Sequence, residues 1–307
     1  MKGWLIHPGA TRWRGPRGVN PGLRILMFIV LVVLLSFLIN LLFGLAIGVE
    51  HLLHHAAHGA AQPKGHRHIH IPSWIFEAIS IIAVIIATQI MTYLENRPFW
   101  TCYLNAKKRV TPVLIGLGCG ILALSVLIGL LLVTGHAQIS FHTAALNVIL
   151  GNGLFQIFLA FLIGFNEEFL FRGYLQQTFK SAVGFWVALI LTSAIFCLAH
   201  LGNPNENIIG IASVFGAGVV LCIGLRQTGA LWWSIGFHAG WDFSEDFLFG
   251  THDSGLAVHG ALLNTVPYGP TWLSGGMVGP EGSIFSLLVE LIAVILLLTL
   301  WRRTATP

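Results

Sequence analysis

Long runs of apolar residues alternate with short polar segments along most of the chain. A transmembrane helix needs about 20 mostly apolar residues, and these runs lack the short alternating pattern of membrane barrel strands. The pattern therefore predicts an all-α protein, a multipass transmembrane helical bundle of about eight spans. The predicted spans are residues 25–49, 72–94, 111–134, 146–166 (continuing as a helix to about residue 180), 183–200, 206–225, 229–248 and 283–301.

Composition supports lipid as the surrounding solvent. Of the 307 residues, 55% are hydrophobic and 9% charged, and the mean hydropathy is +0.80. A soluble domain carries about 25% charged residues. The first apolar run is longer than the core of a signal peptide, so we expect a retained helix. The four cysteines are scattered without a C-x-x-C pair, which indicates packing residues.

Basic residues predict the orientation. Of the 16 Lys and Arg residues, 13 fall on the side that holds both termini. The opposite side holds Lys64 and Arg67, and Arg172 lies within a helical segment. By the positive-inside rule the side that holds both termini is cytoplasmic, and we expect the plasma (inner) membrane of a bacterium. The net charge of +4 then reports topology. The sequence has no basic stripe interleaved with aromatic residues, so no nucleic-acid partner is expected. Membrane lipid is an expected partner.

One predicted outer loop is rich in histidine. Residues 51–70 hold seven of the 14 histidines. His51, His54, His55 and His58 would share one face if the helix continued out of the membrane. Two interpretations remain open: a divalent-metal site, or a polar, pH-sensitive loop with adventitious metal affinity.

Charged residues interrupt the fourth apolar run at G-F-N-E-E-F-L-F-R-G-Y, residues 164–174. A charge at membrane depth costs about 2.5–3.5 kcal/mol on insertion scales, so such residues are usually functional. Glu168 and Arg172 have the i, i+4 spacing of a helical ion pair. Glu167 points about 100° away, given 3.6 residues per turn. We therefore expect Glu168 and Arg172 to be structural and Glu167 to face a cavity.

Other ionisable residues lie in two later spans. His200 ends the fifth span, and the seventh carries His238 and Asp242 one turn apart. The fourth and fifth spans would form a helical hairpin with its turn near residues 181–184, which would place Glu167 and His200 at similar depth. We predict that these four residues form one site. The alternatives are a buried ion-pair lock, a His200 that only binds a carbonyl group, and an Asp242 that begins a wet outer segment.

Three motifs resemble a known family. E-E-F-L-F-R (167–172), F-C-L-A-H (196–200) and H-A-G-W-D (238–242) are similar to the EExxxR, FxxxH and HxxxN/D motifs of the CPBP (Abi) family. That family comprises CAAX proteases and bacteriocin-processing enzymes and includes the eukaryotic Ras-converting endoprotease. The resemblance covers about residues 145–250, and G-G-M-V-G-P-E-G (275–282) also resembles a segment found before the last helix.

The resemblance implies an intramembrane CAAX-type endopeptidase acting on a protein or peptide substrate. It implies that Glu167 and His200 activate water and that His238 with Asp242 stabilises the oxyanion. The family often has Asn in place of Asp242, so this Asp would have to be protonated or orient His238. Residues with structural or orienting roles are Glu168, Arg172 and Phe196. No cofactor is required, although zinc is compatible; the H-E-x-x-H motif is absent.

The predicted organisation has four parts. Residues 1–24 form a basic cytoplasmic N-terminus, 25–134 the first helices with the His-rich loop 50–71, 145–250 the catalytic core, and 251–307 an outer loop and the last helix. Two other classes remain open: a metal or proton transporter that uses the Glu/His/Asp cluster, and a non-catalytic scaffold or immunity protein.

Overall fold

A computed structural model describes residues 19–58, 73–104, 109–141, 143, 145–256 and 260–300. The predictions for the basic N-terminus up to residue 18, most of the His-rich loop, Asn105 and residues 301–307 lie outside this range.

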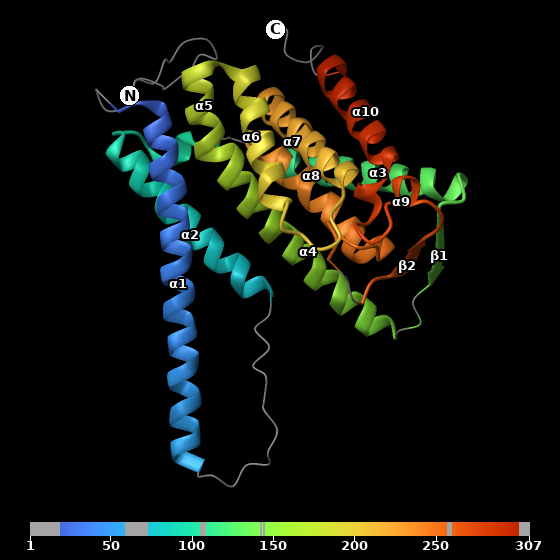
Figure 1. Cartoon of the computed structure of the whole chain (residues 1–307), viewed down its shortest axis with the longest axis horizontal. Helices are drawn as coiled ribbons and strands as arrows, with labels where there is room; N and C mark the ends of the chain where they lie inside the picture. The colour runs from blue at the N-terminus through green and yellow to red at the C-terminus, as the bar shows by residue number, and fades with distance from the viewer. Residues whose placement is uncertain are drawn as a thin grey trace.

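The chain is a bundle of helices with one small sheet (Figure 1). The α-helices are α1 (Pro21–His58), α2 (Ser73–Leu94), α3 (Val110–Val133), α4 (Leu146–Glu168), α5 (Gln176–Val183), α6 (Phe185–His200), α7 (Ile208–Thr228), α8 (Trp232–Phe243), α9 (Thr271–Ser274) and α10 (Ile284–Leu300). Two π-helical segments, η2 (Phe169–Leu175) and η3 (Ser244–Phe249), extend α4 and α8. Short 3-10 turns are η1 (Phe99–Thr101) and η4 (Pro280–Gly282). Strands β1 (Ala137–Phe141) and β2 (Leu263–Pro267) pair antiparallel.

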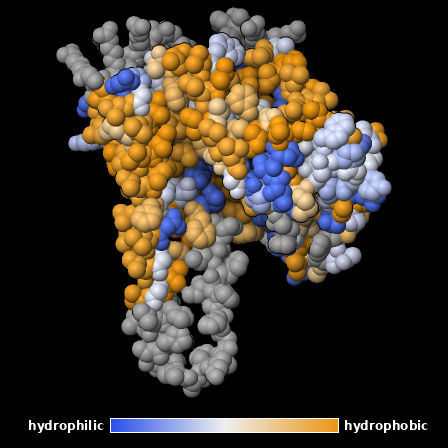
Figure 2. Space-filling model, in the orientation of Figure 1, coloured by the Kyte–Doolittle hydropathy of each residue, from blue (hydrophilic) through white to orange (hydrophobic). Residues whose placement is uncertain are grey.

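The predicted all-α membrane bundle is confirmed. Five helices are long and apolar enough to cross a membrane, and α6 and α10 are shorter apolar helices. The total of eight crossings stays a prediction. Hydrophobic side chains cover α1 and much of the bundle surface (Figure 2), and only 11% of the most apolar window in α1 is buried. All four cysteines are free. The β1–β2 pair was not predicted.

Local signals explain where the helices turn. Gly184, between α5 and α6, has φ +80°, a conformation that favours glycine. Asn207 caps α7, because its Oδ1 accepts hydrogen bonds from the backbone amides of Ile209 and Gly210. These turns reverse the chain, so that α6 packs on α7, α7 on α8, and α8 on α4. The first turn of α1 and the last turn of α10 lie at the same end of the bundle (Figure 1).

A buried charged network anchors α1 and α2 to the segment after α4. Arg24 Nη2 lies 2.6 Å from Glu95 Oε1, and Arg97 Nε lies 2.5 Å from Glu95 Oε2. The Tyr174 hydroxyl, in η2, also donates to Glu95. Glu95 at the end of α2 thus receives donors from three other places in the chain, which fixes η2 relative to the first two helices.

Candidate active site

The two adjacent glutamates have different surroundings. Glu168 Oε1 lies 3.0 Å from Arg172 Nη1, and both side chains are fully buried, whereas the side chain of Glu167 is 27% exposed. The expected Glu168–Arg172 pair is therefore formed. The guanidinium of Arg172 lies 4.2 Å from the ring centre of Phe196, so an aromatic face covers the charge.

The imidazole of His238 lies among three carboxylates. Its Nδ1 is 3.1 Å from Glu168 Oε1, and because an ionised carboxylate only accepts, Nδ1 donates this hydrogen bond. Its Nε2 is 3.6 Å from Glu167 Oε2 and 3.7 Å from Asp242 Oδ1. Four of the predicted site residues thus lie together at His238: Glu167 and Glu168 of α4, and His238 and Asp242 of α8. Glu168 holds His238 as well as Arg172, a contact that sequence reasoning missed.

His200 lies beside this cluster, at the end of α6. Its Nδ1 is 2.9 Å from the Phe196 carbonyl oxygen, so Nδ1 carries the proton of the neutral ring and Nε2 is an acceptor. The rings of His200 and Phe196 are 4.6 Å apart, and those of Phe196 and His238 are 6.2 Å apart. Glu167 and His200 form no direct hydrogen bond, and their facing at equal depth stays a prediction.

Glycines hold α8 against α3 at backbone contact. A Cβ atom at Gly116 or Gly120 of α3 would lie 2.1 Å from a carbonyl oxygen of α8, and one at Gly236 or Gly240 of α8 would lie 2.1 or 2.3 Å from a carbonyl oxygen of α3. Both helices thus carry small residues four apart, the pattern that permits close helix packing in membranes. This contact fixes the rotation of α8, and with it the direction of His238.

A polar contact from α2 extends the site. Asn166 Nδ2 lies 2.9 Å from Glu77 Oε2 and 2.9 Å from Ser80 Oγ. Glu77 is also within electrostatic range of Glu167 and His238. Sequence reasoning missed these residues, although an acid in the apolar run 72–94 was a usable signal.

The acidic residues that end the seventh span are buried. Asp242, Glu245 and Asp246 are 5%, 0% and 8% exposed, so the alternative of a wet outer segment beginning at Asp242 is wrong. The segment 275–282 covers this end of the helix, because Glu281 Oε1 accepts a hydrogen bond of 3.1 Å from Trp241 Nε1.

The loop between α6 and α7 adds a further acid beside His200. Burial raises the pKa of Glu206, and the nearby carboxylate of Glu281 adds to this shift. The same loop lies against η4, because a Cβ atom at Gly282 would lie 2.9 Å from Asn207 Nδ2.

Residues 151–244 match the family model described as type II CAAX prenyl endopeptidase Rce1-like. This segment resembles that family and is called the Rce1-like segment below. The predicted resemblance to the CPBP family is thereby confirmed over that range, and a CAAX-type protease is supported. The Rce1-like segment contains all seven residues to which the sequence assigned catalytic or orienting roles. A search of the curated proteins finds no significant match.

Proposed function

We propose that this multipass membrane protein is an intramembrane endopeptidase that hydrolyses peptide bonds of membrane-associated proteins or peptides. The observation that carries the proposal is the meeting of Glu167, Glu168, His238 and Asp242 inside the Rce1-like segment. The pair of Glu168 and Arg172 accounts for one of these acids as structural, but it leaves the partly exposed Glu167 beside His238 and Asp242 unexplained. A general base and a charge-stabilising donor have to lie close to one reacting carbonyl group.

Glu167 is the proposed general base, because it is the partly exposed member of the glutamate pair. As a water oxygen bonds to the scissile carbonyl carbon, Glu167 takes the released proton. Nε2 of His200, the acceptor nitrogen, orients the water. The carbon–nitrogen bond then breaks, and the proton passes from Glu167, directly or through His200, to the leaving amine. The products are a carboxylic acid and an amine, without an acyl-enzyme.

His238 is the proposed donor to the oxyanion. Its Nδ1 donates to Glu168, so Nε2, the nitrogen that faces Glu167 and Asp242, can donate only when the ring is the doubly protonated imidazolium. The three carboxylates around the ring favour that charged form. We assign Asp242 to orienting this ring, because an ionised carboxylate would repel a developing oxyanion. No cofactor is required in this scheme. We further propose that both termini are cytoplasmic and that the protein lies in a bacterial inner membrane.

Peptide cleavage by purified protein in lipid nanodiscs tests the proposal. The substrates are a peptide library that includes prenylated C-terminal CAAX peptides and their unprenylated counterparts, with products identified by mass spectrometry. Glu167→Gln keeps the shape of the side chain but removes the base, so cleavage should fall at least ~10²–10⁴-fold without loss of thermal stability.

A matched control is Glu290→Gln. This buried acid of α10 accepts a hydrogen bond from Ser213, which a glutamine oxygen can replace, so cleavage should be retained. Folded wild-type protein that cleaves no library member but moves cations or protons across vesicles would overturn the proposal in favour of a transporter.

A further inference from the structure

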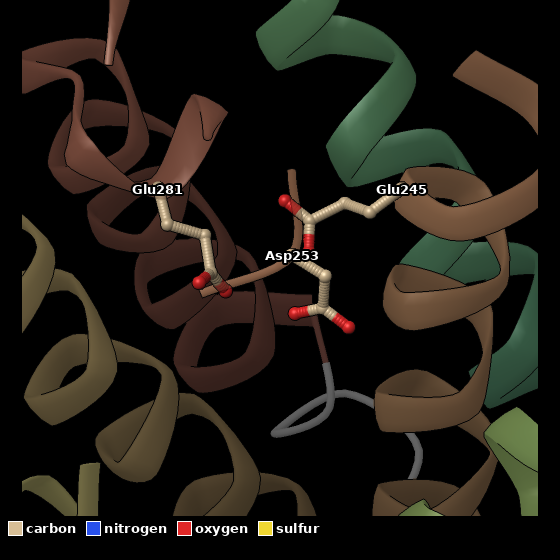
Figure 3. Close-up of side chains that lie close together, drawn as sticks. All are labelled: Glu245, Asp253 and Glu281. Atoms are coloured by element: carbon tan, nitrogen blue, oxygen red, sulfur yellow. The ribbon is translucent and has the colours of Figure 1, made fainter. Parts of the chain in front are cut away.

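A second group of carboxylates lies beyond the proposed active site. Glu245 of η3, Asp253 of the following loop and Glu281 of η4 each place an oxygen atom within 4.8 Å of the other two. Their side chains come from three separate segments and point toward one another (Figure 3).

Glu245 is the unusual member of this group. It is 0% exposed, and neither of its carboxylate oxygens has a hydrogen-bond partner among the described residues. The charged groups that act on it most strongly are Glu281, Asp253, Asp242 and Asp246, all of them acids. A buried carboxylate without donors or a counter-charge is strongly unfavourable. Glu245 therefore needs a positively charged partner or a proton.

The other two ligands are held in place. Glu281 accepts hydrogen bonds from Trp241 Nε1 at 3.1 Å and from Ser254 Oγ at 2.5 Å. The loop that carries Asp253 packs on the segment before η4, because the Gly255 amide donates to the Val278 carbonyl oxygen at 2.7 Å. A Cβ atom at Gly255 would lie 1.8 Å from a carbonyl oxygen of Pro204. This loop is thus enclosed by backbone on two sides.

We propose that Glu245, Asp253 and Glu281 bind a hard divalent cation, for which Ca²⁺ is the expected ion. All three ligands are carboxylates, without the His or Cys that favours zinc. Ca²⁺ binds oxygen at about 2.3–2.6 Å, so two ligands of one ion lie at most about 5 Å apart. The 4.8 Å grouping meets this condition. Three carboxylates supply up to six oxygens, and the ion neutralises Glu245.

The ion would hold the end of the helix that carries the proposed active site. Glu245 follows Asp242 by three residues, and Trp241 donates to Glu281. The bound ion therefore joins η3, the loop and η4 at the end of α8 that carries Asp242. Binding at this site does not depend on the proposed protease function, because it is measured without a substrate.

Terbium luminescence and thermal unfolding test the site. The full-length protein is purified in detergent, treated with EGTA and titrated with Tb³⁺, with excitation of tryptophan; Trp241 lies next to the site. Sensitised Tb³⁺ emission should appear and be displaced by Ca²⁺. At a Ca²⁺ concentration a hundred times Kd, Tm should rise by about 4 °C over the EGTA sample.

Variants assign the signal. Glu245→Gln should abolish the Ca²⁺-dependent rise in Tm and the displaceable Tb³⁺ emission, while its Tm in EGTA should equal or exceed that of the wild type, because the unpaired charge is gone. Asp253→Asn, in the partly exposed loop, is the second variant if Glu245→Gln does not fold. Glu290→Gln should behave as the wild type.

Three results would overturn the inference. If Ca²⁺ leaves the wild-type Tm unchanged and no displaceable Tb³⁺ emission appears, the carboxylates share protons instead of binding an ion. A response retained in both Glu245→Gln and Asp253→Asn would place the ion elsewhere. A response to Zn²⁺ but not to Ca²⁺ would refute the hard-cation assignment.

Discussion

The buried pair of Glu168 and Arg172 allows stability and activity to be separated. Both side chains are fully buried, and Nε and Nη2 of Arg172 already lack partners among the described residues. Glu168→Gln leaves the arginine charge without an acidic partner, facing the rings of Phe196 and Phe171. Breaking a buried pair in this way costs about 3–5 kcal/mol, or on the order of 10 °C in Tm.

Removing the charge as well should restore stability. In the double variant Glu168→Gln with Arg172→Met, no unpaired charge remains, and the glutamine oxygen can still accept the hydrogen bond from His238 Nδ1. In Glu168→Leu with Arg172→Met, that acceptor is lost too. We expect both double variants to unfold near the wild-type temperature but only the first to keep substantial activity, because His238 is oriented through Glu168 at 3.1 Å.

The assay pairs thermal unfolding in detergent with peptide cleavage by the same preparations. The reasoning is refuted at its first step if Glu168→Gln unfolds at the wild-type temperature. It is refuted at its second step if the leucine double variant cleaves as fast as the glutamine one.

Two further predictions concern the packing of α8 and the topology. Gly120→Ala should lower Tm and activity together, because the new Cβ would lie 2.1 Å from the Phe237 carbonyl oxygen, whereas Gly118→Ala, with nothing within 4 Å, should be neutral or slightly stabilising; equal effects would contradict the close contact. In a background without native cysteines, Asn105→Cys should react with a membrane-impermeant thiol reagent only after the cells are opened, and labelling of intact cells would contradict the proposed orientation.

The bundle was predictable because a helix that crosses lipid requires a long apolar run in the sequence. A spanning helix must be apolar over about 20 residues, so runs such as 111–134 locate α3 (Val110–Val133) to within a residue at each end. Short elements carry no such signal. The β1–β2 pair joins residues more than 120 positions apart, and no local pattern of five residues predicts such a partner.

The candidate site was predictable in its members but not in its contacts. Ionisable residues such as Glu167 and His238 are conspicuous inside apolar runs. The bond between Glu168 and His238 depends on the rotation of α8, which the glycine contact with α3 sets. The group of Glu245, Asp253 and Glu281 depends on three segments that meet only in the folded chain. The spacing of residues along the sequence predicts neither this hydrogen bond nor this group of carboxylates.

The glycine contact between α3 and α8 also limits how the protein can move. At these glycines, a Cβ atom would lie about 2 Å from a carbonyl oxygen of the other helix. The two backbones are therefore in direct contact, and no layer of side chains lies between them that could rearrange and let the helices slide. They behave as one rigid body, and His238 travels with it. Whatever motion admits a long substrate must then displace other helices. Of the five helices long enough to span a membrane, α1 has the smallest buried share of its apolar window, 11%, and among the described residues its buried ion pair, Arg24 with Glu95, lies near its first turn.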